Sequence, residues 1–219
     1  MSAPAPNPNP PKPLGGDLRT ALGRAHEAAM TLLADPEGSR LDVVSWLSAH
    51  IAAFEHTIYP VAKRRIADGR TLLEEDRTVV SQLTHLLRIV ERSHSGDVLA
   101  SNVSQQGLHE RLTSLVAEHS EVQTRIVDAI DHTLDPAETA SLARDYAEAL
   151  AHAPTRPHPH LHSRLLYRLD ALRDHVMDTM DSRHVPFPRM PKARIVPGRW
   201  GSYLLGQPHE LGEDEHPPS

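Results

Sequence analysis

Apolar residues recur every three or four positions along much of this 219-residue chain, the spacing of helices that bury one face. The clearest stripe lies within residues 41–66 and consists of Val43, Val44, Leu47, Ile51, Phe54, Ile58 and Val61. The same spacing predicts further helices over residues 17–34, 71–95, 107–133, 136–152 and 163–183. No alternation of apolar and polar residues is long enough to nominate a strand, so the pattern predicts an all-α protein.

Helix start and kink signals support these boundaries. Asp17 is a plausible N-cap for the first helix, and Asp135-Pro136-Ala137-Glu138 combines a cap, a proline in the first turn and an acidic third residue. Pro60 lies inside the second helix, where it lacks an amide donor and should kink the helix.

Four amphipathic helices in series, joined mostly by short turns, predict an up-down four-helix bundle over residues 17–133. Residues 1–16 are rich in proline and predict a disordered tail. Residues 134–183 hold additional helices and a His/Pro-rich strap at 154–162, where weak surface metal binding competes with a role as a rigid connection. Residues 184–219 predict an irregular C-terminal tail.

Composition narrows the range of partners. The net charge is −6 with no concentrated basic face, so we expect no nucleic-acid partner. No apolar run reaches the ~18 residues that span a bilayer, and the N-terminus lacks a secretory signal pattern, so we expect a cytoplasmic protein without a membrane partner. The absence of cysteine excludes disulfides, iron–sulfur clusters and cysteine-ligated zinc. Nothing in the pattern defines an oligomeric state.

Three of the sixteen histidines fall on or beside predicted buried faces: His26, His50 and His119. Glu55 borders the stripe that contains His50, and Gln123 lies one turn beyond His119 on the same side. Imidazoles from facing helices suit zinc or non-haem iron, so we predict a metal site formed by His26, His50 and His119 with Glu55 as a fourth ligand. The alternative is that each histidine is neutral and hydrogen-bonded within a metal-free structural or interaction module.

Over roughly residues 17–133 the chain resembles the hemerythrin-like, or HHE cation-binding, domains. The resemblance rests on HIAAFEHTIYP, which includes His50 and Glu55, on AEHSEVQTRIV around His119, and on His26 in the leading helix. It implies a four-helix bundle with a non-haem di-iron centre and roles in oxygen or nitric oxide binding, peroxide chemistry or metal handling.

The chain departs from that family at the positions of the bridging ligands and on its third helix, where Leu83 or Val80 stands in place of an inward histidine. The carboxylates that bridge the two irons usually stand four residues after a histidine, and here those positions hold Phe54 and Gln123. We therefore expect a divergent member whose cofactor is iron, mono- or dinuclear, or another divalent metal. A bundle that holds no metal remains the alternative.

Overall fold

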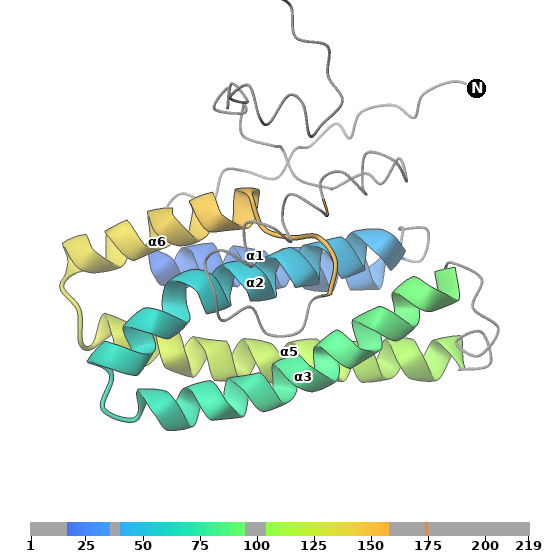
Figure 1. Ribbon diagram of the computed structural model, residues 1–219, viewed down its shortest axis with the longest axis horizontal. Coiled ribbons are helices and arrows are strands. Elements are labelled where there is room, and N and C mark those ends of the chain that lie inside the picture. The colour runs from blue at the N-terminus through green and yellow to red at the C-terminus, as the bar shows by residue number, and fades with distance from the viewer. Residues whose placement is uncertain (1–16, 36–39, 95–103, 158–173, 175–219) are drawn as a thin grey trace, which may run out of the picture. The chain divides into compact units, whose positions relative to one another are not determined.

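The computed structural model describes residues 17–35, 40–94, 104–157 and 174. Within these ranges it contains five helices and no strand, so the all-α prediction is confirmed for this part of the chain (Figure 1). The helices are α1 (Leu18–Ala34), α2 (Arg40–Arg65), α3 (Gly69–His94), α5 (Gln105–Asp131) and α6 (Pro136–Ala151).

The helices begin where their capping residues predict. The Asp17 side chain accepts a hydrogen bond from the Thr20 backbone amide at 2.7 Å, which caps α1. Asp135 and Glu138 form a capping box at the start of α6, with Pro136 in the first turn. The predicted helix over residues 163–183 lies outside the described residues except for Asp174, which is helical and buried.

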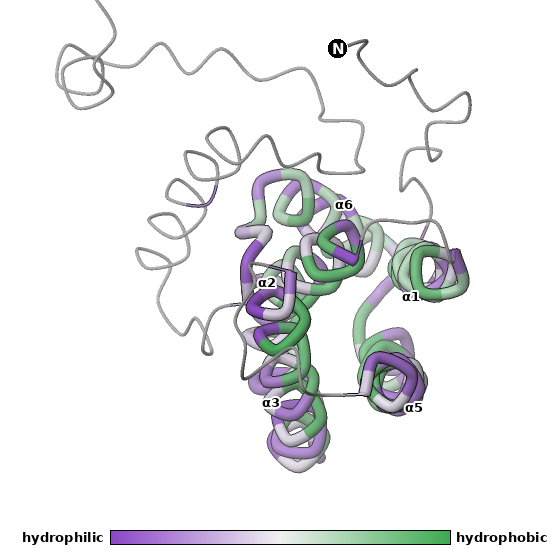
Figure 2. Tube along the Cα trace, turned by 90° about the vertical axis from the view of Figure 1, so that its right-hand side faces the viewer, coloured by the Kyte–Doolittle hydropathy of each residue, from purple (hydrophilic) through white to green (hydrophobic). Residues whose placement is uncertain are grey.

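Four helices contact one another in a closed ring: α1 contacts α2, α2 contacts α3, α3 contacts α5, and α5 contacts α1. The fifth, α6, packs mainly against α2 and also contacts α1 and α5. Figure 2 shows α1 and α5 on one side, α2 and α3 on the other, and α6 beside α1 and α2. Residues of α6, among them Tyr146, belong to the same apolar core as the ring.

Helix α2 is the most enclosed element, because every residue from Val43 to Phe54 is buried. The helix continues through Pro60, and in Figure 1 its last turns run at an angle to its first turns, as the proline predicts. None of the helices in the described ranges combines the length and apolar character needed to cross a bilayer.

Candidate metal centre

The three histidines predicted as ligands lie together in the core. His26 comes from α1, His50 from α2 and His119 from α5. The ring of His50 has its centroid 5.0 Å from that of His26 and 5.4 Å from that of His119. One ring nitrogen from each residue lies within 4.8 Å of the other two, and all three side chains are buried. Helices α1, α2 and α5 thus bring three imidazoles together in the core.

A hydrogen bond between α1 and α2 fixes two of these histidines in register. The indole nitrogen of Trp46 donates to the backbone carbonyl of Ala25 at 2.8 Å, and the contact is buried. Ala25 immediately precedes His26, and Trp46 lies one helical turn before His50. The two backbones are therefore tied together directly beside the two imidazoles.

His119 is held by a carboxylate from α3. Its Nδ1 atom lies 3.0 Å from Oδ1 of Asp76, and the Tyr59 hydroxyl donates to Oδ2 of the same carboxylate at 2.8 Å. An ionised carboxylate only accepts hydrogen bonds, so a neutral His119 carries its proton on Nδ1. Its Nε2 atom then carries a lone pair. This atom is buried and has no hydrogen-bond partner among the described residues.

His26 and His50 share one acceptor, the amide oxygen of Gln123, which lies 3.0 Å and 2.9 Å from their Nε2 atoms. Their Nδ1 atoms face hydroxyl groups. Ser120 Oγ lies 2.8 Å from His26 Nδ1, and the Tyr146 hydroxyl lies 2.6 Å from His50 Nδ1. Each of these imidazoles is therefore hydrogen-bonded at both nitrogens.

Burial keeps these two rings neutral. Burial, followed by the proximity of His119, lowers the pKa of His26 to about 4. Burial, followed by the proximity of His26, also lowers the pKa of His50 well below its ordinary value. Neutral imidazole is the charge state that binds metals, so neither ring has to lose its positive charge before it can act as a ligand.

Glu55, the predicted fourth ligand, is not a member of this group of ligand atoms. Its side chain is half-buried, and its charge helps to raise the pKa of Tyr59, after burial and the charge of Asp76. Phe54, one residue earlier, packs in the core with its ring centroid 6.3 Å from that of His50. The geometry therefore gives Glu55 no support as a ligand.

Sequence reasoning did not single out three residues that contact the histidines: Asp76, Ser120 and Tyr146. For Asp76 a signal existed, because it follows Leu73 by three positions and precedes Leu83 by seven, which places it on the apolar face of its helix. Ser120 and Tyr146 carry no comparable signal, since a serine beside a histidine and a tyrosine on another helix are both common.

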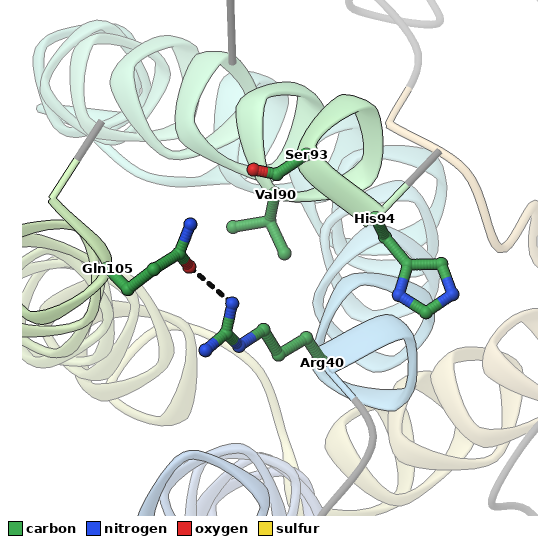
Figure 3. Close-up of a pocket in the computed structure, with 5 residues that line it drawn as sticks. All are labelled: Arg40, Val90, Ser93, His94 and Gln105. Carbon is green, nitrogen blue, oxygen red and sulfur yellow. Dashed lines mark hydrogen bonds between the residues drawn. The ribbon is translucent and has the colours of Figure 1, made fainter. Parts of the chain in front are cut away.

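A pocket of about 290 Å³ lies elsewhere, where α2 and α5 begin and α3 ends (Figure 3). It is lined by Arg40, Val90, Ser93, His94 and Gln105, and the Arg40 guanidinium donates to the Gln105 amide oxygen. Its lining includes none of the three buried histidines.

The chain was also compared with known proteins. No protein-family model, no curated protein and no solved structure matches it. The chemistry of the site has to be inferred from its own residues.

Proposed function

We propose that this protein is a hemerythrin-like metal-binding protein in which His26, His50 and His119 hold one divalent metal ion inside an up-down four-helix bundle. The observation that carries the proposal is the Nε2 atom of His119, a buried lone pair without a partner among the described residues. Leaving a buried acceptor unsatisfied costs about 1–3 kcal/mol. A metal ion bound at this atom would remove that cost.

The partners of the three rings also support the proposal. Metal-bound histidines usually donate their other N–H to a carboxylate, a carbonyl or another oxygen, which orients the ring. Here Asp76, Ser120 and Tyr146 place an oxygen within 3.0 Å of one Nδ1 atom each. Each histidine thus has an oxygen partner on one nitrogen and can present the other nitrogen to a metal.

The donor set favours a single transition metal. Imidazole suits zinc, iron, copper and nickel, whereas calcium and magnesium prefer oxygen ligands. The gathered ligand atoms include three nitrogens and no carboxylate oxygen. The di-iron centre that the resemblance implies uses bridging carboxylates, so these residues fit a mononuclear centre better.

Three protein ligands leave at least one coordination position open, as in catalytic metal sites. An iron ion bound here would supply the chemistry needed for oxygen, nitric oxide or peroxide. The chain itself would limit solvent access through Phe54, Val116 and Val122, which are all buried. A role in metal handling would use the same three ligands and would require no small molecule to bind at the open position.

One observation favours a second function, that of a metal-free structural or protein-interaction module. The amide oxygen of Gln123 already accepts from both His26 and His50, so two of the three rings are satisfied without a metal. Of these three rings, only that of His119 has a nitrogen without a hydrogen-bond partner among the described residues.

Thermal unfolding separates the two functions. Purified protein is stripped with a chelator, and its melting temperature is measured with and without added Zn²⁺ or Fe²⁺ under reducing conditions. A metal that binds only the folded state raises the melting temperature as its concentration exceeds the dissociation constant. The metal-free module predicts no shift. The matched control is His85→Ala, which removes an exposed histidine of α3 and should behave as the wild type.

A further inference from the structure

Gln123 occupies the position from which it can control the proposed site. Its side chain is 1% exposed, and its one amide oxygen lies within 3.0 Å of the Nε2 atoms of both His26 and His50. A carbonyl oxygen can only accept, so both imidazoles donate Nε2–H to it. In this arrangement the Nε2 atom of neither His26 nor His50 has a lone pair to offer a metal.

The partners on the opposite side of the two rings are hydroxyl groups, which can donate or accept. With the proton on Nε2, the hydroxyls of Ser120 and Tyr146 donate to Nδ1 of His26 and His50 respectively. With the proton on Nδ1, the same hydroxyl oxygens accept from it. Both rings can therefore change tautomer without losing their Nδ1 partner.

His119 differs from the other two. Its Nδ1 partner is the Asp76 carboxylate, which has no hydrogen to donate when ionised. In neutral His119 the Nε2 lone pair is therefore available without a change of tautomer, whereas those of His26 and His50 become available only when their protons move to Nδ1.

From this asymmetry we infer that Gln123 is an internal competitor for a transition-metal ion: its amide oxygen holds His26 and His50 in the non-ligating tautomer, and metal binding requires its displacement. The inference rests on the proposed function. His119 is the fixed ligand, and His26 and His50 are ligands that Gln123 releases. Gln123 thereby lowers the affinity of the site.

Metal affinity tests this role. We compare the wild type with Gln123→Leu by titration of the chelator-stripped proteins with Co²⁺ and Zn²⁺, with Gln82→Leu on the surface of α3 as the matched control. Removing a competitor that makes two hydrogen bonds should tighten the dissociation constant by roughly tenfold or more, whereas Gln82→Leu should leave it unchanged. Gln123→Met, which keeps an unbranched side chain, replaces Gln123→Leu if the latter fails to fold.

The outcomes separate the inference from the proposed function. Metal binding by both proteins with equal or weaker affinity in Gln123→Leu overturns the inference, because Gln123 is then neutral or a ligand, and leaves the proposed function standing. Binding by Gln123→Leu alone supports both. Binding by neither protein overturns the proposed function and the inference with it.

A second measurement needs no metal. The nitrogen chemical shifts of histidine rings in an NMR spectrum report which nitrogen carries the proton. In the stripped wild type His26 and His50 should carry it on Nε2, and His119 on Nδ1. A proton on Nδ1 of His26 or His50 in that state would overturn the inference.

Discussion

The Nδ1 atom of His119 lies 3.0 Å from Oδ1 of Asp76, and neither side chain is exposed to solvent. The two residues are 43 positions apart in the sequence and join α5 to α3. A buried carboxylate needs compensating hydrogen bonds, and Asp76 receives them from His119 and Tyr59. The stability of the fold and the orientation of the His119 imidazole therefore both depend on the contact between His119 and Asp76.

Asp76→Asn should weaken metal binding. The substitution keeps the shape of the side chain but removes the charge that fixes the His119 tautomer, and loss of such a partner typically costs 10–100-fold in affinity. Titration with Zn²⁺ gives the dissociation constant. Tyr59→Phe is the control, because it removes one donor to Asp76 and keeps the carboxylate, so its effect should be smaller. Equal affinities in Asp76→Asn and the wild type would contradict this role.

The helices could be predicted from the sequence because their signals are local. The apolar spacing and the caps at Asp17 and Asp135 depend on residues within one or two turns of each other. The inward direction of His119 follows from the same periodicity.

The partners of the histidines could not be predicted in the same way. The spacing of Asp76 from Leu73 and Leu83 places it on the apolar face, but that spacing does not identify its partners, which lie on two other helices, and the acidic run that it ends with Glu74 and Glu75 is typical of a solvated face. Tyr146 lies on a helix that was predicted outside the bundle, yet its hydroxyl contacts His50. Glu55 borders the apolar stripe, but a neighbouring position in a helix is rotated by about 100°, and the site does not include it.

The metal-free protein should lose stability as the pH falls below about 6.5. The pKa of His26 is lowered to about 4 in the folded state, and that of His50 is lowered well below its ordinary value, so the unfolded chain binds more protons than the folded one in this range. Each residue then removes up to about 1.4 kcal/mol of unfolding free energy per pH unit, and the contribution of His26 levels off below about pH 4.

Urea unfolding in the presence of a chelator, between pH 7.5 and 4.5, measures this slope. Replacing His26 by Gln should reduce the pH dependence, whereas His85→Ala, at an exposed position, should not. A slope that is the same in wild type and His26→Gln would show that His26 is not held neutral by the fold.

His50→Leu should destabilise the metal-free protein by about 1–3 kcal/mol, although it replaces a buried polar group by an apolar one. The reason is Tyr146, which is fully buried and would lose the partner of its hydroxyl. Adding Tyr146→Phe should recover part of the loss, because both members of the pair are then apolar. A double-mutant cycle in urea measures the coupling, and strictly additive effects would contradict it.

Gly69 is required by the close approach of α3 to the end of α2. A Cβ atom at this position would lie 2.1 Å from the backbone carbonyl oxygen of Ala62, so the backbone must move in Gly69→Ala. Overpacking of this kind typically costs 1–3 kcal/mol. Gly23→Ala is the matched control: nothing lies within 4 Å of the new Cβ, and alanine in a helix should stabilise by roughly 0.5–1 kcal/mol. Thermal unfolding of both variants should show shifts of opposite sign.

The most direct test of the central claim is the number of metal ions bound per protein chain, measured by elemental analysis after loading and removal of free metal. We predict one transition-metal ion per chain in the wild type and in His85→Ala, and close to none in His119→Ala. A ratio near zero in the wild type, or an unchanged ratio in His119→Ala, would contradict the account.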